Sequence, residues 1–143
     1  MSHAIRVEDM ISAQNIMTKD PRTVPSTIEI SKVVLLLQNV EYHHVPVVDD
    51  TRLVGILSDR DIAQYISRQF AEPEPDKAPS LVPVSEIMTT DIMTVDKGAS
   101  IDCASILLLE HHISCLPVVD DDNHLEGIIT WKDILRYHVY HDV

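Results

Sequence analysis

The sequence of this 143-residue chain contains an internal duplication. Residues 16–50 align without a gap on residues 87–121, and residues 52–62 align on residues 124–134. The two copies are identical at 19 of 46 aligned positions, far more than chance supplies. Self-similarity of this kind indicates one supersecondary unit used twice. Because a unit of about 50 residues buries little apolar surface alone, we expect the two copies to pack together.

Each copy predicts the same succession of elements. A short Thr-Val strand (residues 23–24 and 94–95) precedes an amphipathic helix, expected at residues 28–41 and 100–112. Ser26 and Glu29 resemble a capping box at the start of the first of these helices. Two β-branched runs around an acidic turn then indicate a hairpin, and a second helix follows at residues 59–68 and 131–140. We therefore predict an α+β fold of two units related by a pseudo-twofold axis, with two clefts between them where a ligand can bind.

The repeat also sets the domain boundaries that we expect. A stretch with four prolines and alternating charges separates the copies, which is typical of an extended linker. The expected parts are a lead-in segment at 1–15, a first unit at 16–70, a linker at 71–83 and a second unit at 84–143.

Composition excludes several classes of protein. The net charge of −12 argues against a nucleic-acid partner, since binding to phosphates needs a basic surface. No apolar run approaches the roughly 18 residues of a membrane span, and the first residues do not resemble a signal peptide. Two cysteines are too few for a disulfide framework. We expect a cytoplasmic protein with neither a nucleic-acid nor a membrane partner.

The sharpest motif is Gly-h-h-[Ser/Thr]-x-x-Asp (h, apolar), found at residues 55–61 and 127–133, where a strand passes into a helix. Glycine there allows a ligand to approach the backbone, and the start of a helix offers N–H groups to an anion. A carboxylate three residues later can accept hydrogen bonds from two adjacent hydroxyls, the pattern of a ribose. The same residue types are also those of an ordinary helix cap, so both interpretations stand for Ser58, Asp61, Thr130 and Asp133.

The duplicated units resemble a tandem pair of CBS (cystathionine-β-synthase) domains, also called a Bateman module. The resemblance covers about residues 16–139. It rests on the two motifs above, the Met-Thr pairs at 17–18 and 88–89 and the Pro-Val-Val-Asp runs at 46–49 and 117–120. It implies β-α-β-β-α units, clefts that bind adenosine-containing ligands (AMP, ADP, ATP, S-adenosylmethionine or NAD(H)), regulation of another protein, and a homodimer.

The resemblance also assigns roles to residues. Asp61 and Asp133 match the ribose-binding aspartates, with Ser58 and Thr130 beside the ribose or phosphate and Arg60 and Lys132 near phosphate. The strands that enter Pro-Val-Val run from His43 through His44 to Val45, and from Ile113 through Ser114 and Cys115 to Leu116. The Asp61 cleft would take Ser58, Arg60, His43 and His44 at its polar end, and Thr89, Ile113, Ser114 and Cys115 around adenine. Thr18 is the counterpart of Thr89. Since positions 114 and 115 carry no basic residue, we expect the Asp61 cleft to bind phosphate more tightly.

Catalytic and metal sites are not predicted. The sequence has no nucleophile with a base and an orienting partner, no paired carboxylates and no glycine-rich phosphate loop. The histidine pairs at 43–44 and 111–112, and His138 with His141, lack a carboxylate or cysteine at ligand spacing, so we expect no metal. Cys103 is expected to be a small buried residue, and Met17, Met88 and Met93 are expected to pack at the interface of the two units.

These expectations lead to one main hypothesis. The chain is a stand-alone, non-catalytic module that senses AMP, ADP or ATP, hence cellular energy, and modulates an unknown partner protein. It has no catalytic cofactor, and its charge favours AMP or a cationic adenosyl compound over ATP. The alternatives are a ligand-independent dimeric scaffold, or a sensor of S-adenosylmethionine, NAD(H) or a divalent metal.

Overall fold

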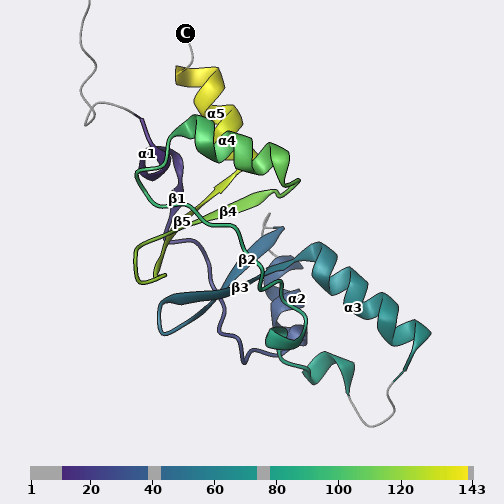
Figure 1. Cartoon of the computed structure of the whole chain (residues 1–143). Coiled ribbons are helices and arrows are strands. Elements are labelled where there is room, and N and C mark those ends of the chain that lie inside the picture. Colours follow the sequence, from purple (N-terminus) through teal and green to yellow (C-terminus); the bar gives the residue numbers. More distant parts are fainter. Residues whose placement is uncertain (1–10, 39–42, 74–77, 142–143) are drawn as a thin grey trace, which may run out of the picture. The chain divides into compact units, whose positions relative to one another are not determined.

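The computed structural model of the protein describes residues 11–38, 43–73 and 78–141 (Figure 1). The chain divides into two compact units, each described here by itself. Unit 2 is Pro21–Ile92, and unit 1 comprises the described parts of Met1–Asp20 and Met93–Val143. Residues 1–10 of the expected lead-in segment lie outside the described residues. Among the described residues, none of the helices combines the length and the apolar character that a membrane crossing requires.

Unit 2 is a β-hairpin packed against two helices. Its elements are α2 (Ile30–Gln38), β2 (His44–Asp49), β3 (Arg52–Ser58), α3 (Asp59–Ala71) and two short 3-10 helices, η2 (Pro79–Leu81) and η3 (Val84–Glu86). The hairpin is antiparallel with His44 opposite Ser58, and Val24 adds a parallel bridge to Val47. The predicted hairpin and second helix of the first copy are confirmed, with α3 running three residues further than expected. The first helix is confirmed over Ile30–Gln38, and residues 39–41 of its expected range lie outside the described residues. The expected 23–24 strand is present only as the bridge at Val24.

The core of unit 2 lies between the hairpin and the apolar faces of its helices. Val33 of α2 and Leu57 of β3 are fully buried, and α3 contributes Ile62 and Tyr65, one turn apart. Burial of such side chains stabilises each by about 1.5–3 kcal/mol relative to exposure.

Unit 1 has the same plan with one more strand. Its elements are α1 (Ala13–Ile16), β1 (Thr18–Lys19), α4 (Ile101–Glu110), β4 (Cys115–Val119), β5 (Leu125–Thr130) and α5 (Trp131–His141). The sheet has the order β1-β5-β4, and all its neighbouring strands are antiparallel. Leu108, Leu116 and Ile129 are fully buried in its core. This unit confirms the hairpin and both helices predicted for the second copy.

The compact units do not coincide with the sequence repeats, because each Met-Thr pair joins the hairpin of the other copy. Thr18, at the start of the first copy, pairs with Ile128 in β5. Thr89, at the start of the second copy, forms an antiparallel bridge with Ile56 in β3, with both backbone hydrogen bonds at 2.9 Å. The two pairings occupy equivalent places in the repeat. The Met-Thr segment of each copy therefore pairs with the hairpin of the other copy.

Three local predictions are wrong. Ser26 does not cap α2, because its hydroxyl donates to Asp49 Oδ2 at 2.6 Å and the helix begins only at Ile30. Part of the expected extended linker is packed instead: Val82 is buried, and the Tyr65 hydroxyl donates to the Pro79 carbonyl at 3.0 Å. Cys103 is exposed, since the buried stripe of α4 runs through residues 101, 104 and 108.

Candidate functional site

The Asp61 carboxylate is held at the start of α3 by a reciprocal cap. Its Oδ2 atom accepts a hydrogen bond from the Ser58 backbone N–H at 2.9 Å, and the Ser58 hydroxyl accepts one from the Asp61 N–H at 3.1 Å. The capping interpretation of the motif is thus geometrically real. It does not use up the carboxylate, because two oxygens together offer about four acceptor positions.

Thr89 reaches the same carboxylate from the second Met-Thr segment. Its hydroxyl donates to Asp61 Oδ1 at 3.2 Å and lies 3.4 Å from Oδ2. The resemblance grouped Thr89 with Asp61, and the structure brings the two together. Asp61 is half-buried and Thr89 is exposed, so the acceptor positions that remain face an accessible surface.

Two histidines flank this carboxylate at the start of β2, in different surroundings. The His43 side chain is 79% exposed, and its Nδ1 lies 2.8 Å from Asp59 Oδ2. His44 is half-buried, and its pKa is lowered mainly by burial and next by the nearby His43, while Asp59 and Asp61 partly offset this. His44 is therefore neutral near pH 7 and offers one ring N–H as a donor.

The equivalent carboxylate in unit 1 is more enclosed. The Asp133 side chain is 5% exposed, and its Oδ2 accepts from the Thr130 N–H at 2.9 Å and from the Thr130 hydroxyl at 3.2 Å. Arg136 Nη1 lies 3.9 Å from Oδ1, too far for a good hydrogen bond. The hydrogen bonds of Asp133 are thus those of the helix cap, and its carboxylate is less accessible than that of Asp61.

Cys115 takes the place in unit 1 that His44 takes in unit 2, opposite the cap residue of the hairpin. Its side chain is buried, and burial together with the Asp133 charge raises the pKa of the thiol to about 12. Cys115 is therefore a neutral thiol at physiological pH and cannot act as a nucleophile or bind an anion.

The glycine of each motif makes room for a methionine of the fold. A Cβ atom on Gly55 would lie 2.4 Å from Met88 Sδ, and one on Gly127 would lie 2.6 Å from Met17 Sδ. The methionine of each Met-Thr pair fills the space that glycine leaves. Sequence reasoning missed this link, although the recurrence of both Met-Thr and the glycine at fixed positions was its signal.

The structure gathers the predicted site residues into two groups. Unit 2 holds His43, His44, Val45, Ser58, Arg60, Asp61 and Thr89, and unit 1 holds Thr18, Ile113, Ser114, Cys115, Leu116, Thr130, Lys132 and Asp133. Arg60 and Lys132 are exposed, while Val45 and Leu116 are core residues. The grouping of Ile113, Ser114 and Cys115 with Asp61 stays a prediction. Within the described residues, no three His, Cys, Asp or Glu side chains form a metal-ligand cluster.

Comparison with known proteins identifies the family. The CBS domain model matches residues 11–68 and 84–140, and the chain belongs to the CBS domain family. It is 33% identical over 125 residues to the CBS domain-containing protein YhcV of Bacillus subtilis, covering 87% of this chain and 84% of YhcV. It is also 33% identical over 121 residues to the homoserine O-acetyltransferase of Methanocorpusculum labreanum, covering 84% of this chain. That match spans only 23% of the acetyltransferase, so the chain corresponds to about a quarter of that relative.

Solved structures agree with this assignment. The crystal structure of CBSX2 in complex with AMP has a TM-score of 0.79 and 25% identity, covering 92% of this chain and 98% of CBSX2. The CBS domain pair of protein MJ0100, in complex with 5′-methylthioadenosine and S-adenosyl-L-methionine, has a TM-score of 0.77 and 30% identity. The match covers 91% of this chain and 97% of that pair.

Proposed function

We propose that the chain is a regulatory module that binds an adenosyl ligand, with Asp61 as the acceptor for the ribose hydroxyls. The observation that carries the proposal is the geometry of Asp61. Two segments far apart in sequence converge on this carboxylate, through Ser58 and Thr89, yet leave it half-exposed with acceptor positions to spare. The complexes of CBSX2 with AMP and of the MJ0100 pair with two adenosyl compounds support the ligand class.

The surroundings of Asp61 favour a monophosphate or a cationic adenosyl ligand. Arg60 is the exposed cation next to the carboxylate, and His44 is neutral near pH 7. A ligand phosphate beside His44 would favour the protonated form of that histidine. Binding of AMP would therefore be coupled to uptake of a proton by His44 as the pH falls toward 6. The net charge of −12 further disfavours ATP at low ionic strength.

Regulation follows from differential affinity. A bound ligand shifts an equilibrium only as far as it prefers one state over the other. Because Thr89 follows η3 and Asp61 opens α3, a ribose held by Asp61 would restrict both segments at once. We propose that a partner protein responds to this change and that the chain itself carries no catalytic activity.

A ligand panel tests the proposal. Purified chain is heated with AMP, ADP, ATP, S-adenosylmethionine or NADH, and the unfolding midpoint is recorded. A ligand at 100 times its dissociation constant stabilises by about 2.7 kcal/mol, which raises the midpoint by several degrees. D61N keeps the cap acceptor but removes the charge, so it is expected to fold and to lose the shift. D102N, which neutralises an exposed carboxylate in the first turn of α4, is the matched control and should keep it.

A dimeric scaffold is the second candidate, and the surface of unit 1 favours it. Helices α4 and α5 contact each other and expose Ile106, Leu109, Leu135 and Val139, each more than half exposed. Large apolar side chains exposed on two contacting helices favour an interaction site. We propose that a second copy of the chain covers this face. Light scattering of L135E/V139E is expected to report a monomer where the native chain is a dimer. A native monomer would refute this part of the proposal without touching the ligand site.

A further inference from the structure

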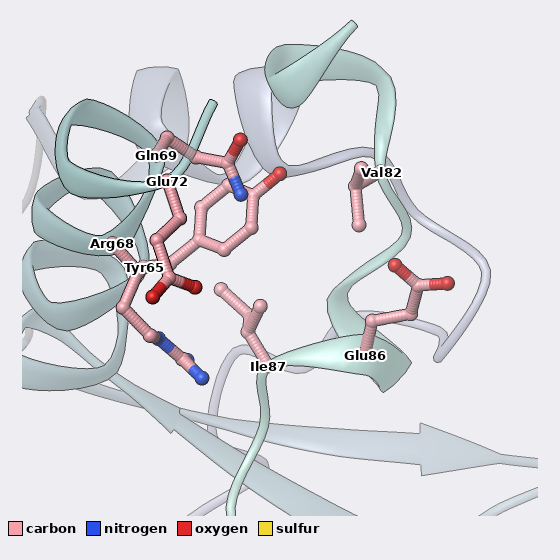
Figure 2. Close-up of a pocket in the computed structure, with 7 residues that line it drawn as sticks. All are labelled: Tyr65, Arg68, Gln69, Glu72, Val82, Glu86 and Ile87. Carbon is pink, nitrogen blue, oxygen red and sulfur yellow. The ribbon is translucent and has the colours of Figure 1, made fainter. Parts of the chain in front are cut away.

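A pocket lies in unit 2, apart from the residues that surround Asp61. It has a volume of about 230 Å³ and is lined on one side by Tyr65, Arg68 and Gln69 of α3 and by Glu72, which follows the helix. Val82, Glu86 and Ile87 line the opposite side (Figure 2). None of the residues predicted to bind an adenosyl ligand lines it. The pocket therefore belongs to neither of the sites described above.

The size of the pocket limits its ligand. An apolar cavity of about 150 Å³ is known to hold benzene, so a pocket of this volume suits a ligand of roughly ten non-hydrogen atoms. A complete adenine nucleotide is considerably larger. The pocket is thus matched to a small metabolite of about the size of an aliphatic amino acid.

The charges that line the pocket are of both signs. Arg68 is exposed in the last turn of α3 and Glu72 directly after the helix, and the exposed Glu86 of η3 lines the opposite side. Among the described residues, neither Arg68 nor Glu72 has an ion-pair partner within 4 Å. A guanidinium binds a carboxylate in a two-pronged manner, and carboxylates bind an ammonium group. The lining is therefore complementary to a ligand that carries both groups.

The remaining lining residues supply an apolar wall. Tyr65 and Val82 are buried, and Ile87, which is half-buried, points toward α3 in Figure 2. The Tyr65 hydroxyl donates to the Pro79 carbonyl, which holds the tyrosine ring in this wall. Small ligand sites commonly combine such an apolar wall with a few polar groups that fix orientation.

We propose that this pocket binds a small aliphatic α-amino acid as its zwitterion. The ligand carboxylate pairs with Arg68, the ammonium group lies between Glu72 and Glu86, and the side chain packs on Val82 and Ile87. The site goes beyond the adenosyl site and does not depend on it. Its walls are nevertheless α3 and the segment leading to Thr89, the two elements that meet at Asp61. An amino acid held here would thus tie together the elements that position that carboxylate.

The test is a titration of the purified full-length chain with L-valine, followed by thermal shift and calorimetry. Isobutylamine and isovalerate, which each lack one of the two charged groups, are run in parallel. At ten times its dissociation constant, L-valine is expected to raise the midpoint by about 4 °C, and each single-charge analogue by much less. L-alanine, L-leucine and L-methionine extend the series to shorter and longer side chains.

Variants separate this site from a general effect on stability. R68M and E72Q change exposed side chains, so both are expected to fold, and each should weaken L-valine binding at least tenfold. R22M removes an exposed arginine of the same unit outside the pocket and should leave binding unchanged. Absence of a shift with every amino acid at 10 mM would overturn the proposal, as would equal binding by R68M and the native chain. A response to isobutylamine equal to that to L-valine would overturn the zwitterion and leave a site for amines.

Discussion

Replacement of each motif glycine by alanine should destabilise the two units unequally. At Gly55 the three atoms nearest to the new Cβ all belong to the Met88 side chain, with Sδ at 2.4 Å and Cγ at 2.8 Å. At Gly127 the new Cβ would meet Met17 in the same way and also the Thr18 carbonyl oxygen, at 2.8 Å. A methionine side chain can move, whereas the Thr18 backbone is fixed by its pairing with β5. Overpacking costs about 1–3 kcal/mol, and replacing glycine returns about 0.4–1 kcal/mol through the unfolded chain.

We therefore expect G55A to cost about 1 kcal/mol and G127A about 2–3 kcal/mol. Urea unfolding followed by circular dichroism measures both, provided that the slope is unchanged. Truncation of the methionine provides the matched test. M88A should relieve the cost of G55A, giving a coupling of about 1 kcal/mol in a double-mutant cycle, because it removes the three nearest contacts of the new Cβ. M17A should reduce the cost of G127A only in part, because the Thr18 carbonyl oxygen still lies close to the new Cβ. Equal costs for the two glycines, or equal couplings, would refute this account of the Met-Thr segments.

Three further predictions concern titratable groups and thiols. Cys115, with a pKa of about 12, should resist Ellman's reagent at pH 8 while exposed Cys103 reacts; two reactive thiols in the native state would contradict this. The Asp49 pKa is lowered by the Ser26 hydroxyl and N–H, so its stabilising effect is present above the ordinary value of 3.8 and is lost as the pH falls through the folded value. S26A should then narrow the difference in urea midpoint between pH 6 and pH 3, and an unchanged difference would argue against the bond. The lowered His44 pKa makes the unfolded chain bind more protons below pH 6.5, so the native chain should lose more stability between pH 7 and pH 5 than H44Q; equal losses would count against burial of this ring.

Much of the fold was predictable because the duplication supplied each element twice. The hairpins at 44–58 and 115–130 and the helices that follow them lie where apolar periodicity placed them. The failures share a physical cause, which is competition from a tertiary partner. Ser26 has the residue type of a cap, but Asp49, 23 positions away, offers its hydroxyl and N–H a better acceptor. No local pattern contains that contact.

The candidate site could be predicted from the sequence only in part. The resemblance paired Thr89 with Asp61, and the hydrogen bond between them is present. The local motif could not distinguish a cap from a ligand site, and the structure shows why: Ser58 and Asp61 form the cap while the carboxylate keeps accessible acceptor positions. The sequence did not reveal that each Met-Thr segment pairs with the hairpin of the other copy, because the boundaries of a repeat record the duplication and not the packing. The pocket beside Tyr65 was hidden for a related reason, since its second wall combines Val82 of the predicted linker with Glu86 and Ile87 of the predicted second unit.

The role of Asp61 as the ribose acceptor is tested most directly by calorimetric titration of AMP into the native chain, D61N and D102N, repeated with S-adenosylmethionine. We predict measurable binding of at least one ligand by the native chain, the same affinity for D102N, and a loss of at least tenfold for D61N, because a charged acceptor contributes about 1.5–3 kcal/mol to a hydrogen bond. D133N should lose less, since that carboxylate is 5% exposed and committed to its cap. Binding of equal strength by D61N and the native chain would contradict the assignment, and absence of binding by the native chain would remove the adenosyl function altogether.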